Sequence, residues 1–539
     1  MPPTHAPSAT AHDVFAGQCQ AGTGYYQPVS SEAPHPRPIT VLDLFAGCGG
    51  LTEGFHQYRP QGSTGPVFRS VGAVEWEPAA AATYAANFGA GAPRSGGLAA
   101  PEIVCRDIVG WEPEWRPGDV EVVVGGPPCQ GFSALNRERV RAERNTLWQE
   151  FIRIVVALQP KVFVIENVDR FLRSVEFKDL KERIGGADLS NYRLVDPGSK
   201  PGETEWEHDR RYLLNAADFG SPQARRRAIV IGVRTDVDLP IDLMRYPEPT
   251  HSKDVLRYKD ALEGLQAPSG ENEPWNIVDP LFAESAGMPL VSELKSPATA
   301  AFEGIPGKFS GPFLTTELHV GRSPEPISLA RYRAIPPGGN RKDLRGRYVC
   351  RPDGGDELII QKVGEYRDGA GLLNVLGAYR IVDAGRLTER RLVVSSTICA
   401  RSADGRGGVR GRSQVYRVVV RRGEVDVSAE LEYLSTEAWD SHDAGAGDVM
   451  GRIRVGKPSV TIRTEFFKPE KGRYLHPMED RPLTHFEAAR LQGFPDDFKW
   501  LGSKLDIAKQ IGNAVPIPLG RKIAEAIYAY LAQGDVAGR

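Results

Sequence analysis

The sequence predicts an α/β fold: a doubly wound, mostly parallel sheet joined to a second, β-containing domain. Short apolar runs rich in β-branched residues recur between residues 39 and 168, each closed by glycine, proline or an acid. A helical pattern separates two of these runs, and such alternation is typical of parallel sheets. Beyond residue 240 the alternation fades, and strand-like pieces stand among loops, which indicates the second domain.

The composition is that of a folded globular chain. Of 539 residues, 41% are hydrophobic and 25% are charged, which excludes a mainly disordered, collagen-like or coiled-coil protein. The formal net charge is −2, from 67 basic and 69 acidic residues. The chain therefore lacks a general basic coat for nucleic acid, and any DNA-binding surface has to be local.

No apolar run of about 18 residues is present, and the N-terminus lacks the basic and apolar pattern of a secretory signal, so we expect neither a membrane span nor export. The six cysteines are scattered and form no CxxC pair, which argues against a disulfide framework and against a metal site. We expect a cytoplasmic protein.

The predicted elements of the first domain follow one another along the chain. Residues 1–36 are rich in Pro, Ala, Ser and Gly and predict a mobile tail. Six apolar runs predict strands: 39–47, 70–77, 102–108, 120–129, 161–168 and 225–234. Each ends in a polar or glycine-rich cluster. Ligands of open α/β sheets bind at the carboxyl ends of the strands, so functional residues are expected there.

Three segments predict helices. Apolar residues from Leu147 to Leu158 recur on one helical face, and Pro160 ends that helix. Thr484 with Glu487 three residues later is a capping box that opens a helix. The last segment, from about residue 517, again has one apolar face.

The middle of the chain, residues 239–455, is loop-rich, with strand-like pieces at 356–364, 391–400 and 414–427. Residues 400–422 hold seven arginines and one aspartate among glycines. This stretch is either a solvated hairpin loop or a loop that contacts nucleic acid, and the sequence weighs the two equally.

The first cluster with chemical potential is the glycine-rich turn from Asp43 to Gly50, directly after a predicted strand. Glycines allow a ligand to approach the backbone closely. Glu75 and Trp76 end the second run and Asp107 ends the third. A glycine turn with acids on successive strands fits an adenosine-containing cofactor, although a nicotinamide or flavin enzyme or a tight structural turn also accounts for it.

The second cluster is a Gly-Gly-Pro-Pro-Cys turn that presents the Cys129 thiol at the end of a buried run. A free cysteine is more often a small buried hydrophobe than a nucleophile. Its place in a rigid turn at the edge of the sheet favours the nucleophile here. Cys48 is the rival thiol, and its place in the glycine turn suits cofactor contact better.

Two further clusters are Glu166, at the end of the fifth run, and the Gln-Ala-Arg-Arg-Arg sequence before the sixth. Glu166 is either a proton-handling carboxylate or a structural acid. If the sixth run is a strand, Arg225 and Arg227 share one face and Arg226 points the opposite way.

Taken together, these clusters resemble the motifs of bacterial-type DNA (cytosine-5)-methyltransferases. Six motifs occur in that family's order: DLFAGCGGLTEGF, GGPPCQGFS, ENV, QARRR, RLQGFPDDF and IGNAVP. The resemblance implies a Rossmann-like S-adenosylmethionine-dependent fold. It divides the chain into the tail (1–36), a catalytic domain (37–238), a target-recognition region (239–455) and a return segment that completes the catalytic domain (456–539).

The resemblance also implies the reaction. The Cys129 thiolate would add to carbon 6 of a cytosine flipped out of double-stranded DNA, and Glu166 would hold ring nitrogen 3 and the exocyclic amine. Arg225 would steady the base or its phosphate. The expected DNA contacts are Gln130, Ser133 and Arg227. Arg410 and Arg412 are expected contacts as well, because arginines cluster with glycines around them.

S-adenosylmethionine is the implied cofactor. Phe45 would stack on its adenine, Glu75 would bind the ribose hydroxyls, and Pro127 would line the methyl-donor pocket. The remaining expected contacts are Gly47, Gly49, Trp76, Asp107, Asn513 and Val515.

Four alternative functions fit part of the sequence. An amino-methylating DNA enzyme would need an Asn or Asp before the Pro-Pro step, where this chain has Gly126. A transfer-RNA cytosine methyltransferase shares the motifs but has a short variable region, so RNA stays open as a substrate. A catalytically silent relative would have lost Cys129 or Glu166, and a nicotinamide oxidoreductase leaves the later motifs unexplained. We expect a monomer, acting alone or beside a restriction endonuclease of the same site.

Overall fold

The computed structural model describes most of the chain from residue 37 onward. The described residues are 37–63, 65–95, 99–128, 139–186, 188–254, 273–295, 298–364, 375–383, 385–395, 415–422, 425–441 and 448–537. The predicted tail, residues 1–36, lies outside them. None of the helices within these ranges is long and apolar enough to cross a membrane.

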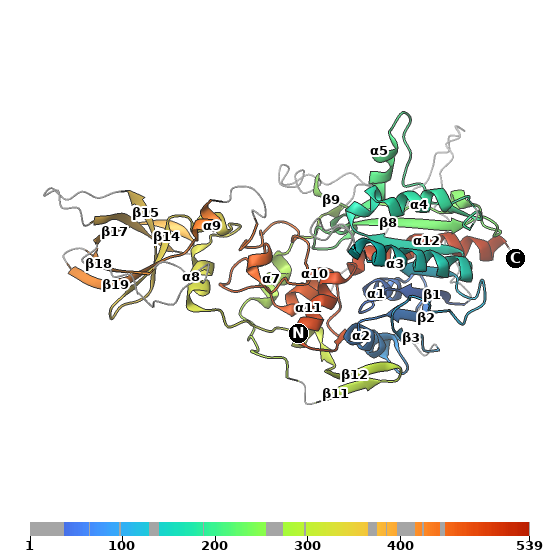
Figure 1. The fold of residues 1–539 in the computed structure, drawn as a ribbon, viewed down its shortest axis with the longest axis horizontal. Helices are drawn as coiled ribbons and strands as arrows, with labels where there is room; N and C mark the ends of the chain where they lie inside the picture. Colours follow the sequence, from blue (N-terminus) through green and yellow to red (C-terminus); the bar gives the residue numbers. More distant parts are fainter. Residues whose placement is uncertain are drawn as a thin grey trace, which may run out of the picture.

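An eight-stranded sheet forms one end of the molecule (Figure 1). Its order is β3-β2-β1-β4-β5-β8-β6, and β7 also pairs with β8. The pairs from β3 through β5 are parallel, and β8 is antiparallel to its three partners. The strands are β1 (Ile39–Leu44), β2 (Phe68–Glu75), β3 (Glu102–Cys105), β4 (Val122–Gly125), β5 (Val162–Asn167), β6 (Tyr192–Leu194), β7 (Leu213–Asn215) and β8 (Arg226–Arg234).

The strand order reverses direction between β1 and β4. From β1 the chain moves outward to β2 and β3 and then returns to β4 on the other side of β1. In doubly wound sheets such a switch point opens a crevice at the carboxyl ends of the two strands. The loops that follow β1 and β4 therefore border the expected ligand site.

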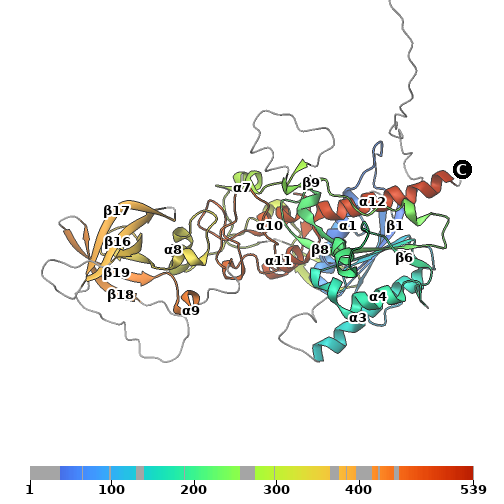
Figure 2. The same ribbon diagram turned by 90° about the horizontal axis from the view of Figure 1, so that it is seen from above.

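Helices cover both faces of the sheet, as Figure 2 shows. One face packs against α1 (Gly50–Gln57) and α12 (Ile517–Ala537), the other against α3 (Arg139–Leu158) and α4 (Val175–Arg183). Along β1, Val41 belongs to the first core and Leu42 to the second. Burial on both faces accounts for the continuous apolar runs of the sequence.

The centre of the molecule is built from segments far apart in the chain (Figure 1). There α2, which follows β2, shares a core with one helix from the middle of the chain and two from the return segment, residues 456–539. These helices are α2 (Pro78–Phe88), α7 (Asp279–Ser285), α10 (His485–Gln492) and α11 (Lys504–Asn513). Short pieces surround them: α5 (Glu205–Asp209), β9 (His251–Ser252), β10 (Glu273–Pro274), β11 (Thr299–Phe302), β12 (Ile305–Ser310), β13 (Phe313–Leu314) and β20 (Lys499–Trp500).

A closed antiparallel barrel stands at the far end of the molecule from the sheet (Figures 1 and 2). Its strands are β14 (Arg347–Pro352), β15 (Leu358–Gly364), β16 (Val375–Asp383), β17 (Arg386–Ser395), β18 (Val415–Arg422) and β19 (Val425–Tyr433). The helices α8 (Pro326–Ala334) and α9 (Glu437–Asp440) flank it. The strand-like pieces predicted in the middle of the chain lie in β15, β17, β18 and β19, whereas closure into a barrel was not predicted.

The predicted α/β class, with a mostly parallel sheet and a second β-containing part, is confirmed. The predicted strand 102–108 is shorter, because β3 ends at Cys105. The predicted capping box is present: the Thr484 hydroxyl accepts from the Glu487 amide, and the Glu487 carboxylate accepts from the Thr484 amide.

Candidate active site

The glycine loop, residues 45–50, joins β1 to α1 and has an unusual backbone. Phe45, Gly47 and Gly49 all have positive φ angles, of 57°, 56° and 88°. A Cβ at Gly49 would lie 2.5 Å from the Phe88 ring, so only glycine fits there. At Gly47 a Cβ would meet no described atom within 4 Å, so the backbone is open. A phenylalanine in the left-handed region is strained, and such strain gathers at functional sites.

Glu75 closes β2 and supports the glycine loop. Its Oε2 accepts a hydrogen bond from the Gly47 amide and its Oε1 one from the Glu77 amide, both at 2.8 Å. Burial raises the pKa of Glu75, against the opposing effect of these two hydrogen bonds. The neighbouring Trp76 is 68% exposed, an unusual state for so large an aromatic ring. Asp107, after β3, is exposed as well.

The loop after β4 forms the other border of the crevice. Pro127 is buried, and its carbonyl accepts a hydrogen bond from the Asn167 side chain at 3.0 Å. Gly126 leaves room for Glu166, because a Cβ there would lie 2.8 Å from the Glu166 Oε2. The side chains of Asn167 and Glu166 at the end of β5 therefore pack against the start of the Pro-Pro turn. Cys129, Gln130 and Ser133 themselves lie outside the described residues.

Glu166 is paired with Arg227. The Arg227 Nε lies 2.7 Å from the Glu166 Oε1, and the two side chains are 14% and 13% exposed. The antiparallel register of β5 and β8, with Glu166 opposite Ile229, brings the pair together. A carboxylate held by a guanidinium is fixed in orientation.

Arg225 has a different environment from the one expected. It is 2% exposed, and its guanidinium donates to the backbone carbonyls of Ile462 at 2.8 Å and Gly512 at 3.0 Å. A third donor bond, of 3.4 Å, reaches the Asn513 carbonyl. Burial, with the nearby charge of Arg227, lowers its pKa to about 9. These bonds tie Arg225 to the return segment, whereas the guanidinium paired with Glu166 is that of Arg227.

Two buried glutamines connect three of the sequence motifs. The Gln223 side chain accepts from the Ile462 amide at 2.8 Å and donates to the Gln492 Oε1 at 2.9 Å. Gln492 in turn donates to the Ile511 carbonyl at 2.6 Å. Neither glutamine was predicted to have a role. Only their place inside the motifs QARRR and RLQGFP distinguished them.

The return segment lies directly against the glycine loop. A Cβ at Gly50 would lie 3.0 Å from Ala514 and 3.2 Å from the Val515 carbonyl. Val515 is buried and Asn513 is exposed. Cys48, the rival thiol, is buried 3.8 Å from the Gln510 carbonyl, and burial raises its pKa. It is therefore held as a thiol and is a poor nucleophile.

The arginine-rich stretch 400–422 is described only from residue 415. Arg410 and Arg412 lie outside the described residues. On β18, Arg417 is paired with Asp353, and the Arg421 Nε lies 2.7 Å from Asp426. Acids on the barrel surface thus offset part of the positive charge that the sequence concentrates here.

Comparison with known proteins decides the family. The family model for C-5 cytosine-specific DNA methylase matches residues 39–279 and 411–529. The chain belongs to this family. The matched residues include the glycine loop, the Pro-Pro turn, Glu166, Arg225, Arg227 and the return segment.

Relatives of this methylase include bacterial Type II methyltransferases. It is 36% identical to M.XorII of Xanthomonas oryzae over 498 residues, which cover 91% of this chain and 84% of that protein. M.AgeI of Thalassovita gelatinovora is 27% identical, with 91% and 99% covered. The DNA (cytosine-5)-methyltransferase PliMCI of Paracentrotus lividus is 26% identical over 92% of this chain, which spans only 29% of that relative's length.

Among solved structures, a DNA modification methyltransferase encoded in an E. coli prophage matches with a TM-score of 0.43 and 20% identity, covering 92% of this chain and 99% of that one. The methylase family confirms the resemblance drawn from the six motifs. It also rules out the nicotinamide oxidoreductase that the glycine turn alone had left open.

Proposed function

We propose that this methylase transfers a methyl group from S-adenosylmethionine to carbon 5 of a cytosine that is flipped out of a specific double-stranded DNA sequence. The observation that carries the proposal is the Glu166–Arg227 pair beside the Pro-Pro turn, across the sheet's switch point from the glycine loop. A base-holding carboxylate and a cofactor loop on the two borders of one crevice are what methyl transfer to a base requires.

The residues around the glycine loop fit S-adenosylmethionine. The open backbone at Gly47 leaves room for a ligand, and the exposed face of Trp76 suits an adenine ring. Both Glu75 oxygens retain an acceptor site for ribose hydroxyls after their backbone hydrogen bonds. When bound, this cofactor supplies an electrophilic methyl group. We assign the contacts Phe45, Gly47, Gly49, Glu75, Trp76, Asp107, Pro127, Asn513 and Val515.

Cys129 and Glu166 make the ring carbon reactive. Carbon 5 of cytosine is a poor nucleophile until the Cys129 thiolate adds to carbon 6 and Glu166 gives a proton to ring nitrogen 3. Carbon 5 then forms the new bond to the methyl group while the bond from this group to the sulfonium sulfur breaks, which leaves a neutral thioether. Loss of the carbon-5 proton to a base or ordered water expels the thiolate, and the nitrogen-3 proton returns to Glu166. Arg227 orients the Glu166 carboxyl during both proton transfers.

A cytosine inside a stacked duplex is out of reach of Cys129, so the base has to leave the helix. We assign DNA contacts to Gln130, Ser133 and Arg227 near the flipped base and to Arg410 and Arg412 in the recognition region. The partner is double-stranded DNA, and the Type II relatives favour a restriction endonuclease of the same site as companion.

Bisulfite sequencing of DNA from a methylation-free bacterial host that expresses this chain tests the proposal. We expect 5-methylcytosine at one short recurring sequence and none in a host that expresses Glu166→Gln. Unmodified DNA with methylated transfer RNA from the same cells would contradict the DNA assignment and favour the RNA alternative.

Gly126→Ala tests whether the room beside Glu166 matters. The new Cβ would lie 2.8 Å from the Glu166 Oε2, so we expect the carboxylate to shift while the backbone keeps its conformation. A misplaced catalytic group costs roughly 10- to 100-fold in kcat. We expect that loss at an unchanged Tm, measured with purified DNA.

Gly65→Ala is the matched control, because a Cβ at Gly65 would meet no described atom within 4 Å. It should leave both kcat and Tm unchanged. Equal activity of Gly126→Ala and the native protein would show that the position of Glu166 is not critical.

A further inference from the structure

Asp43, the next-to-last residue of β1, is a buried carboxyl group directly before the glycine loop. It is 2% exposed, and it accepts a hydrogen bond from the Thr52 hydroxyl of α1 at 2.7 Å. Within the described part of the protein, no positively charged side chain contributes to the electrostatic environment of Asp43. Burial, reinforced by the charge of Glu75 and opposed by the Thr52 hydrogen bond, raises the pKa of Asp43 to about 7. A carboxyl group with this environment exists in both protonation states near neutral pH.

A chain of hydroxyl groups leads away from Asp43. The Thr52 Oγ1 lies 3.1 Å from the Tyr84 hydroxyl, and that hydroxyl lies 2.8 Å from the Ser70 Oγ. Thr52 and Tyr84 are buried, and Ser70 is half-buried. Three side chains from α1, α2 and β2 therefore link a buried acid to a position that solvent reaches.

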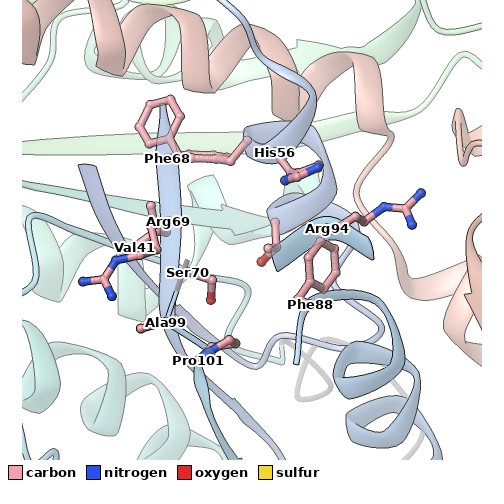
Figure 3. Close-up of a pocket in the computed structure, with 11 residues that line it drawn as sticks. Val41, His56, Phe68, Arg69, Ser70, Phe88, Arg94, Ala99 and Pro101 are labelled. Atoms are coloured by element: carbon pink, nitrogen blue, oxygen red, sulfur yellow. The ribbon is translucent and has the colours of Figure 1, made fainter. Parts of the chain in front are cut away.

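The hydroxyl chain leads to a pocket between α1, α2 and β2. Figure 3 shows Ser70, His56 and Arg69 among the side chains that line it, with Phe68 and Phe88 as apolar walls. Thr52 lines it as well. Burial and the charges of Arg59 and Arg94 lower the pKa of His56 to about 4, so this histidine is neutral at pH 7. The pocket thus offers polar groups to water beside the last hydroxyl.

The hydroxyl groups of Thr52, Tyr84 and Ser70 can form a complete set of hydrogen bonds in either direction. When Asp43 is ionised, Ser70 donates to Tyr84, Tyr84 to Thr52, and Thr52 to the carboxylate. When Asp43 is protonated, each donor turns round, and the Ser70 hydroxyl can donate to the Gly72 carbonyl 3.4 Å away. Because hydroxyl groups both donate and accept, no polar group loses its partner in either state.

We propose that Asp43 is a proton-exchanging counter-charge of the cofactor site and that Thr52, Tyr84 and Ser70 form its proton path to the pocket. The Asp43 proton passes to Thr52, a Thr52 proton to Tyr84, a Tyr84 proton to Ser70, and a Ser70 proton to water. Every hydroxyl gives one proton and receives one, so the net change is a carboxylate at Asp43 and a proton in solution.

The charges around Asp43 favour this response to a cation. Glu75 faces it from β2, Tyr84 from α2, and Cys48 from the glycine loop, and none of these groups is positively charged. A sulfonium brought to the glycine loop would be the first positive charge to act on Asp43, and it would favour the ionised form. The thioether of the product S-adenosylhomocysteine is neutral and would not favour the ionised form of Asp43. The inference rests on the proposed cofactor.

Proton release measured by calorimetry tests the counter-charge. S-adenosylmethionine and S-adenosylhomocysteine are titrated into the full chain in two buffers of different ionisation enthalpy at pH 7. We expect release of about half a proton per bound S-adenosylmethionine from Asp43, because a group with pKa about 7 is half protonated there. Asp43→Asn should lose that release, and the thioether should not produce it. As the pH rises from 5 to 8, affinity for the sulfonium should rise in the native chain relative to Asp43→Asn.

Infrared difference spectra of the native chain supply a second measurement that needs no variant. The carbonyl band of a protonated carboxyl group should disappear on binding of S-adenosylmethionine and a carboxylate band appear. Tyr84→Phe removes the middle hydroxyl but keeps the ring, so it should slow the release of the proton in stopped-flow measurements with a pH indicator at unchanged equilibrium release. Ser63→Ala removes a hydroxyl group that is not part of the hydroxyl chain, so it should not slow the release of the proton.

If S-adenosylmethionine binds to the native protein and to Asp43→Asn with the same proton release, Asp43 is not the counter-charge. Equal release rates in Tyr84→Phe and native protein would overturn the path. If S-adenosylmethionine does not bind at all, the proposed function fails first and this inference fails with it.

Discussion

Cys129→Ala should abolish methyl transfer to cytosine and leave the binding of S-adenosylmethionine intact. The methyl-accepting carbon becomes reactive only after a thiolate adds to the ring, and alanine has no atom that can form this bond. The cofactor contacts proposed above come from other residues, so its affinity should stay within about twofold. Transfer of labelled methyl groups to DNA and calorimetric binding of the cofactor measure the two effects.

A matched control separates this effect from the loss of a thiol as such. Cys350 is a free, buried cysteine in the barrel core, far along the chain from the Pro-Pro turn. Cys350→Ala should lower Tm slightly, by the loss of a small buried side chain, and retain methyl transfer. A covalent complex with DNA that carries 5-fluorocytosine should form with Cys350→Ala and not with Cys129→Ala. Transfer by Cys129→Ala at the native rate would exclude this residue as the nucleophile.

Much of the catalytic fold was predictable because its signals are local. The β-branched runs around Val123 and Val164 are buried on both faces, and each strand end carries the polar or glycine-rich cluster that borders the crevice. The Thr484–Glu487 capping box needs only a four-residue pattern. These features depend on neighbours in sequence, so one sequence suffices to find them.

The rest depends on contacts between distant segments. The barrel is closed by pairing of β14 with β19, about 80 residues apart, and no local pattern specifies that register. The arginine-rich stretch, for which the sequence favours a solvated loop and a DNA contact equally, includes Arg417 and Arg421, whose acidic partners come from the folded barrel. In the same way, the sequence places Arg225 and Arg227 on one side but cannot say which of them meets Glu166.

Arg225→Met and Arg227→Met should separate the structural arginine from the one at the site. Arg225→Met removes the donors to the carbonyls of Ile462, Gly512 and Asn513, which stay buried among the core of the return segment. Loss of these charge-assisted hydrogen bonds is expected to lower the stability by roughly 3 kcal/mol, partly offset because a buried charge is removed with them. A clear fall in Tm should result.

Arg227→Met breaks the ion pair with Glu166 at the partly open edge of the crevice, where water can replace the lost partner. Its Tm should fall less than that of Arg225→Met. Its kcat should fall by about 10² to 10³, the range expected when a preorganised charged donor is removed from an active site. Arg225→Met, assayed below its melting range, should keep most of its kcat. The reverse pattern, a stable but inactive Arg225→Met beside an active Arg227→Met, would return the base contact to Arg225, because a guanidinium that only joins the return segment to the sheet cannot be lost without a loss of stability.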